Sequence, residues 1–307
     1  MKKRLFSLLL AALMFCAAPA AAYGTEIENT ADAGDGVIIT QEDKPYLALG
    51  ADLSADEQHT VLDLMGIRAE DFDLYDVAYV NNSEEHTYLD AYVPKEKIGT
   101  RALSSVFICL EEEGAGVSIS TYNINYCTVG MYKNALATAG IVDASIIVAG
   151  PFPISGTAAL VGTFKAYEEL TGESLDEAVV DAAMDELVTT GELEESIGGD
   201  AEDVEAMIAD LKGRIARGEL EGTEDIRAAI EDAAKNYHIE ITEADKEKLL
   251  ELLEKLKDLD LDWDKIADQA SKLVDQLNDA VKNNGGFFES IKNFFENLFN
   301  TIRSWFS

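Results

Sequence analysis

The chain has 307 residues and a large excess of acidic side chains, with 59 Asp and Glu against 24 Lys and Arg. The resulting formal net charge of −35 at pH 7 repels nucleic acid and anionic lipid at long range, so no nucleic-acid partner is expected. The length is sufficient for at least one domain with its own core.

Residues 1–22 have the three parts of a secretory signal. Cationic residues 2–4 precede an apolar run over residues 5–18, and three alanines close the segment. The run is shorter than the ~20 residues that a membrane-spanning helix needs. We therefore expect cleavage near Ala22 and an extracytoplasmic protein, either secreted or associated with the cell envelope. Cleavage leaves 21 Lys and Arg against 59 Asp and Glu, a net charge of −38.

An α+β fold is predicted for the part of the chain that follows. Residues 23–43 have little to bury and are predicted to form a flexible lead-in. Over residues 44–172, strand and helix patterns alternate with short connections, which is typical of a compact mixed domain. The predicted strands are 46–50, 76–81, 87–93, 103–110, 117–126 and 144–149, and the predicted helices are 55–65, 129–139 and 157–170.

Local signals fix several of these boundaries. Ser54 with Glu57 forms a capping-box pattern, and Gly66 ends that helix. Residues 81–83 suit a turn between two strands, and residues 113–116 predict a hairpin. The uncharged span 144–164 contains prolines in its middle, so strand, loop and helix explain it better than a membrane span.

Two cysteines, Cys109 and Cys127, remain after signal cleavage. The predicted hairpin places Cys109 opposite a residue near Ser120, so a disulfide needs a bend or an adjacent third strand. Export permits oxidation. Two alternatives stay open: a disulfide between these residues, or two buried free thiols.

An acidic, all-α region is predicted for residues 173–282. Apolar residues recur at helical spacing over 174–189, 203–217, 225–237, 243–256 and 263–281, which indicates a bundle or a string of helices. Residues 287–306 are then predicted to form an amphipathic aromatic helix, typical either of a membrane interface or of docking on protein. Its apolar face comprises Phe287, Phe288, Ile291, Phe294, Phe295, Leu298, Phe299, Ile302, Trp305 and Phe306.

The strings LGADLSADEQ, IGTRALSS, YNINYCTVGMYKNALATAGI and PFPISGTAALVGTFKAYE resemble the YpuA-like family of exported Gram-positive bacterial proteins of unknown function. The resemblance covers residues 44–172, and the helical region and the aromatic tail lie outside it or match it only loosely. It implies export and one shared domain, and it brings no catalytic residues.

Motifs for known chemistry are missing from the sequence, so no metal site and no cofactor are predicted. The run Asp258-x-Asp260-x-Asp262 lacks the Gly and Glu of a calcium loop, and Asp262 is predicted to cap the next helix. The Gly150–Gly156 stretch lacks the spacing and the lysine of a phosphate loop. A weaker ligand-binding site is predicted where a helix opens after a strand, at Ser155, Gly156, Thr157, Tyr126 and Asn123, although capping by Ser155 is the usual role of such a residue.

Three functions follow as hypotheses. The leading one is an exported, non-catalytic protein whose α+β domain binds a partner or ligand and whose C-terminal helix contacts a membrane surface or another subunit. The second is an envelope enzyme acting on cell-wall or small-molecule substrates, with a pocket near Ser155 and Thr157. The third is a structural protein that self-associates through its helical region.

Overall fold

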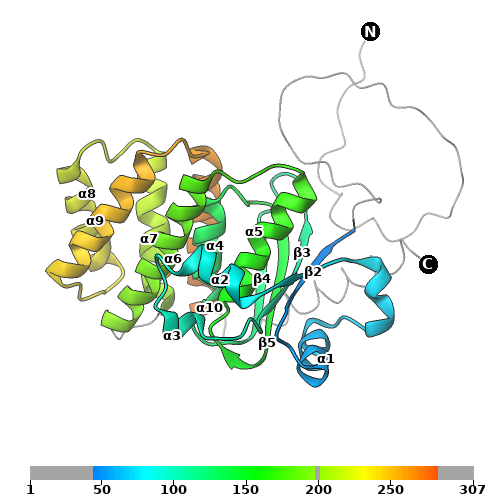
Figure 1. The fold of residues 1–307 in the computed structure, drawn as a ribbon. Helices are drawn as coiled ribbons and strands as arrows, with labels where there is room; N and C mark the ends of the chain where they lie inside the picture. Colours follow the sequence, from blue (N-terminus) through cyan, green and yellow to red (C-terminus); the bar gives the residue numbers. More distant parts are fainter. Residues whose placement is uncertain (1–43, 198–200, 283–307) are drawn as a thin grey trace, which may run out of the picture.

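The computed structural model describes residues 44–197 and 201–282 (Figure 1). The predicted signal, the lead-in over residues 23–43 and the aromatic stripe at 287–306 lie outside the described residues and stay predictions.

A mixed five-stranded sheet forms the centre of the α+β fold, as predicted. The strand order is β2-β1-β3-β5-β4, with parallel pairing at both edges and antiparallel pairing on either side of β3. The strands are β1 (Tyr46–Gly50), β2 (Asp76–Val80), β3 (Ser105–Leu110), β4 (Val117–Ile124) and β5 (Ala144–Ile154). The central strand β3 is buried along its whole length, which explains its apolar run from Val106 to Leu110.

Helix α1 (Ala55–Met65) and the 3₁₀ helix η2 (Ala69–Leu74) pack on one face of the sheet (Figure 1). Alternate strand residues such as Leu47, Phe107 and Ile147 pack there against Val61 of α1. The predicted capping box is confirmed, because the Ser54 side chain accepts from the Glu57 N–H and the Glu57 carboxylate accepts from the Ser54 N–H.

The opposite face carries the larger core. It is covered by α2 (Asn82–Leu89), α3 (Lys95–Ile98), α4 (Val129–Thr138), α5 (Thr157–Thr171) and α6 (Glu177–Ile197). Strand residues Val106 and Val148 belong to one continuous cluster with Leu160 of α5 and Leu187 of α6. This cluster therefore crosses the domain boundary that the sequence predicts at residue 172.

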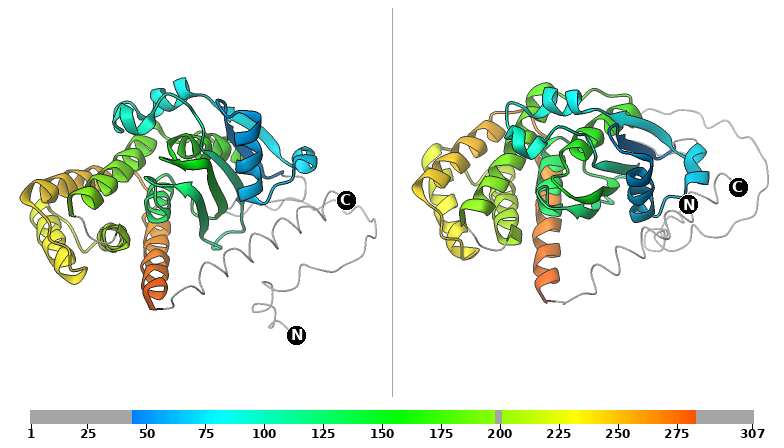
Figure 2. Two further views of the ribbon diagram at one scale, coloured as in Figure 1. Left: turned by 90° about the horizontal axis from the view of Figure 1, so that it is seen from below. Right: turned by 60° about the horizontal axis from the view of Figure 1, so that its bottom comes forward.

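The remaining helices lie beside the first core, and the first three of them, with the end of α6, build a second core (Figure 1). They are α7 (Ala201–Ala216), α8 (Thr223–Asn236), α9 (Glu243–Lys257) and α10 (Trp263–Lys282), and α10 packs on α7 and α4 (Figure 2). Asp262 caps α10 as predicted, by accepting from the Lys265 N–H at 3.1 Å. No helix in the described ranges is long and apolar enough to cross a bilayer.

Two sequence predictions are wrong. The hairpin predicted between β3 and β4 does not form, because β5 lies between these strands and pairs with both. The strand predicted over residues 87–93 is replaced by α2, because Asn81 caps a helix and shares a capping box with Glu84 where a turn was expected. The apolar residues Leu89 and Val93 are buried at helical spacing.

A buried ion pair connects the helical region to the sheet-covering helices. Lys212 of α7 and Glu186 of α6 are 1% and 0% exposed, and their charged atoms lie 2.8 Å apart. The Lys212 ammonium also donates to the Asn134 carbonyl at 2.8 Å and to the Thr138 hydroxyl at 2.7 Å, both in α4. Three helices thus share one desolvated charge network. Removing one charge from it lowers the folding stability strongly, whereas replacing both charges by apolar side chains changes the stability little.

Replacing only one member of this pair will destabilise the whole protein. Lys212→Met leaves the Glu186 carboxylate buried without its counterion and is expected to cost about 3–5 kcal/mol in urea unfolding. The double variant Lys212→Met with Glu186→Leu removes both charges and is expected to recover most of that loss. The control is the exposed ion pair of Lys248 and Glu192. Lys248→Met breaks this pair and is expected to lower the free energy of unfolding by less than about 1 kcal/mol. Equal losses for Lys212→Met and Lys248→Met would contradict this role.

Candidate functional site

The predicted ligand site lies where β4 and β5 end. The two strands are parallel, and helices α4 and α5 begin shortly after them, so two helix N-termini open at the same edge of the sheet. This is the edge where open α/β sheets bind ligands, because backbone N–H groups there attract negative charge. The side chains that occupy these two N-termini therefore decide what the site can bind.

The start of α5 is occupied by the protein's own side chains. Thr157 is 1% exposed and donates from its hydroxyl to the Glu85 carboxylate at 3.0 Å, while Ser155 lies 3.1 Å from the same hydroxyl. The Ser104 hydroxyl accepts from the Ala159 N–H at 2.9 Å. Ser155 makes no capping bond, and the position before the helix is Gly156 at φ +99°. Hence the Thr157 hydroxyl, in the predicted site, is bound by Glu85 of the same chain.

The start of α4 also carries a buried acid, which here binds backbone N–H groups. Glu205 reaches it from α7, is 2% exposed, and accepts from the Thr128 hydroxyl and from the Gly130 and Met131 N–H groups. A Cβ on Gly130 would lie 2.0 Å from a carboxylate oxygen of Glu205, so this glycine permits the approach. Negative charge at a helix N-terminus is stabilising, and here the helical region supplies it.

The space between the two N-termini is filled. The Tyr132 hydroxyl, completely buried, donates to the Gly156 carbonyl at 2.7 Å. The Cys127 N–H donates to the Ser155 carbonyl at 2.9 Å, which ties the end of β4 to the end of β5. A Cβ on Gly156 would come within 3 Å of Ile124 and of the Tyr132 hydroxyl. Among the described residues these groups form a packed core at this point.

Burial raises the pKa of the acids around the site. It raises the pKa of Glu85 to about 7 and that of Glu205 to about 7. Glu194 of α6 has its pKa raised to about 8, first by burial and then by repulsion from Glu205 and Glu195. One Glu194 oxygen is buried without a hydrogen-bond partner among the described residues, which fits a carboxyl that holds its proton at neutral pH.

The other two predicted site residues lie away from this buried centre. Tyr126 is partly buried, and the Lys97 ammonium lies 4.6 Å from the centre of its ring. Burial, followed by the nearby Cys127 and Glu195, raises its pKa. Asn123 is exposed at a bulge in β4, at φ +57°, and donates to the Gly150 carbonyl at 3.0 Å. The structure therefore joins Ser155, Gly156 and Thr157 to Glu85, and leaves Asn123 at the surface.

The two cysteines are free and buried, which decides between the alternatives left open by the sequence. Cys109 belongs to the core on the α1 face, and Cys127 to the core on the α4 and α5 face. The sheet separates them, so a disulfide between them does not fit this fold. Burial raises the pKa of each thiol to about 12, which makes both unreactive.

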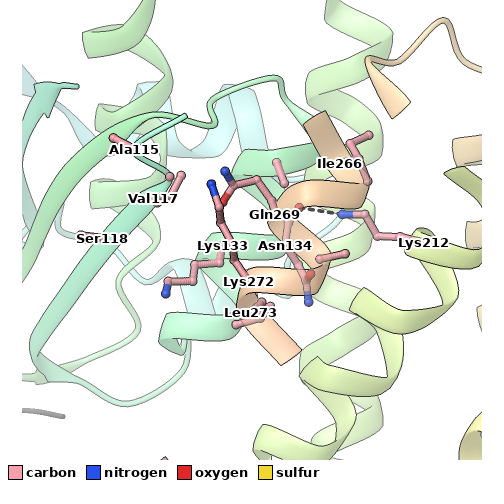
Figure 3. Close-up of a pocket in the computed structure, with 13 residues that line it drawn as sticks. Ala115, Val117, Ser118, Lys133, Asn134, Lys212, Ile266, Gln269, Lys272 and Leu273 are labelled. Carbon is pink, nitrogen blue, oxygen red and sulfur yellow. Dashed lines mark hydrogen bonds between the residues drawn. The ribbon is translucent and has the colours of Figure 1, made fainter. Parts of the chain in front are cut away.

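A small cavity of about 50 Å³ lies at the opposite end of β4 from this site, between β4, α4 and α10 (Figure 3). Lys133, Lys212 and Lys272 contribute to its wall, and a dashed line in Figure 3 marks the bond from Lys212 to Asn134. Burial lowers the pKa of Lys133 to about 8. The volume suits a few water molecules, whereas ligand pockets usually measure roughly 300–1,000 Å³.

Sequence reasoning missed Glu85, Glu205 and Glu194 as members of the site. Each stands among other acidic residues in a chain with 59 of them, so residue type gives no signal. The one local hint is Gly130, a glycine in the first turn of a predicted helix, where a close approach is a common reason for glycine. Nothing local indicates that the approaching group comes from residue 205.

The raised pKa of Glu194 predicts that stability falls as pH rises. The folded chain holds this proton more tightly than the unfolded chain, so the benefit is complete below about pH 4.5 and lost as pH passes about 8. Glu194→Gln is therefore expected to stabilise the protein at pH 8.5 by on the order of 1–2 kcal/mol, less than the full shift implies because the group is partly solvated, and to change little at pH 4.5.

Urea unfolding at both pH values measures the effect. The matched control is Glu240→Gln, at an exposed position. A Glu194→Gln variant that is equally stable relative to the parent chain at both pH values would contradict the assignment.

Comparison with known proteins identifies the family. The pattern of the family described as "Protein of unknown function (DUF1002)" matches residues 49–273, so the family similarity extends well beyond residues 44–172 and includes the helical region. The chain is also 37% identical to "Uncharacterized protein YpuA" of Bacillus subtilis (strain 168), over the full length of both proteins. No solved structure matches the chain significantly. The chain belongs to the DUF1002 family of proteins of unknown function.

Proposed function

We propose that this protein is an exported, non-catalytic protein of the cell envelope that attaches to the membrane surface through residues 287–306. The observation that carries the non-catalytic part is the occupation of both helix N-termini at the sheet edge by Glu85 and Glu205. Glu205 already binds two N–H groups at the start of α4, and Glu85 already binds the Thr157 hydroxyl at the start of α5, where a substrate would have to bind.

The residues assigned to the enzyme hypothesis are poorly placed for catalysis. Thr157 and Gly156 are buried, and the Thr157 hydroxyl is bonded to Glu85. A nucleophile or a general base must reach the substrate within hydrogen-bond distance. Opening this site would separate Tyr132 from Gly156 and would expose the core between the two helices.

Export rests on residues 1–22, whose charge and length fit a cleavable signal. Attachment rests on the ten apolar residues of the stripe, six of which are Phe and one Trp. Aromatic side chains favour the boundary between lipid and water. Because the mature chain would carry a net charge of −38, attachment must come from apolar burial and must overcome repulsion from anionic lipid.

Apolar attachment opposed by charge repulsion predicts that binding to anionic vesicles rises with salt, which co-sedimentation measures. The mature chain is expected to bind phosphatidylcholine vesicles, and to bind vesicles containing phosphatidylglycerol more weakly at low salt, with recovery as salt screens the repulsion. Phe295→Ser, in the stripe, is expected to weaken binding about tenfold, whereas Asn297→Ser, on the polar face, leaves it nearly unchanged.

Two results would contradict the proposal. Equal co-sedimentation of Phe295→Ser and the parent chain would remove the role of the stripe in membrane binding. Recovery of the protein from the cytosol with an intact Met1 would remove export. Concentration-dependent association of the chain without vesicle binding would favour contact with another subunit.

A further inference from the structure

Strand β2 leaves one edge of the sheet open and partly apolar. It is the terminal strand of the sheet order, and no strand of the described residues pairs with its outer side. Val77 and Tyr79 are 37% and 55% exposed, although both lie on the face that holds Leu47 and Leu49. These two side chains thus mark an uncovered margin of the core on the α1 face.

The backbone of β2 is also available along this edge. The Asp76 N–H donates to Pro45, and the Val80 carbonyl accepts from Ala51, so both residues direct their polar groups toward β1. Because this direction alternates along a strand, the N–H and C=O groups of Val77 and Tyr79 point to the open side. The Lys165 ammonium reaches the Tyr79 carbonyl from that side at 3.5 Å. An unpaired edge of this kind is a template for another strand.

The chain enters the fold beside this edge. Pro45 lies next to Asp76 at the start of β2, and the Lys44 ammonium donates to the Asp73 carbonyl at 2.7 Å. Residues 37–40, Val-Ile-Ile-Thr, precede this point by a few positions and are the strongest β-forming run between the predicted signal and β1. Residues 41–45 can span roughly 17 Å, more than the ~10 Å between β1 and a strand beyond β2.

We propose that residues 37–40 pair with β2 as an antiparallel sixth strand. Placing Ile39 opposite Val77 and Val37 opposite Tyr79 directs four apolar side chains to the same face, where cross-strand pairs stabilise a sheet. Thr40 then lies opposite Asp76, an exposed position. Residues 41–43 form the connection. The last third of the predicted lead-in would therefore belong to the folded domain.

A cysteine pair tests the pairing and its register in the mature chain. Thr40→Cys with Asp76→Cys places two thiols on directly opposite residues and is expected to oxidise readily and completely. Thr30→Cys with Asp76→Cys is the matched control, with a cysteine ten residues earlier, and is expected to cross-link poorly. The native thiols are buried and will not compete. Equal cross-linking of both pairs would overturn the proposal, because a freely moving segment gives that result.

Amide hydrogen exchange at Val77 and Tyr79 gives a second readout. Ile39→Asp is expected to speed exchange at both amides by about tenfold, since local pairing is lost, whereas Ile27→Asp, outside the segment, leaves it unchanged. Equal exchange in both variants would overturn the proposal. Protection that rises with protein concentration would also overturn it, because β2 would then pair with a second copy.

Discussion

The structure depends on two buried carboxylates that bind helix N-termini. Glu85 from α2 reaches the start of α5, and Glu205 from α7 reaches the start of α4. Glu205 accepts from two of the N–H groups that α4 leaves unpaired, whereas Glu85 accepts from the hydroxyl of Thr157, the first residue of α5. Because one acceptor comes from the helical region, the two cores are connected by electrostatics as well as by apolar contact, and the family similarity over residues 49–273 fits this unity.

The same constraint shapes the proposed function. Parallel strands β4 and β5 end at the edge where a substrate or a phosphate would be bound in many α/β proteins, and here that edge is closed from within. The closure has an electrostatic cost, since burial holds the pKa of Glu85 and Glu205 near 7. In our proposal the binding role then falls to the aromatic stripe.

Local signals predicted much of the fold correctly. Ser54 with Glu57, the Gly66 stop and the Asp262 cap all act within one helical turn, so the sequence alone suffices to place them. The two errors had different causes, one long-range and one local. Nothing between residues 110 and 117 indicates that β5 will lie between β3 and β4, and the capping box at Asn81 competed with a turn of similar composition. Long-range pairing also explains why the sequence does not assign Glu205 to the site, because Glu205 is 77 residues from Thr128.

The ionisation of Glu85 and Glu205 reports whether this end of the sheet is closed. Carbon-detected NMR titration of the side-chain carboxyls, assigned with Glu85→Gln and Glu205→Gln, follows each proton individually. The account predicts that both groups titrate near pH 7 in the folded chain, well above an ordinary glutamate at 4.5. Titration of both near pH 4.5 would show solvated carboxylates at an open sheet edge, and would contradict the closed site from which the function is inferred.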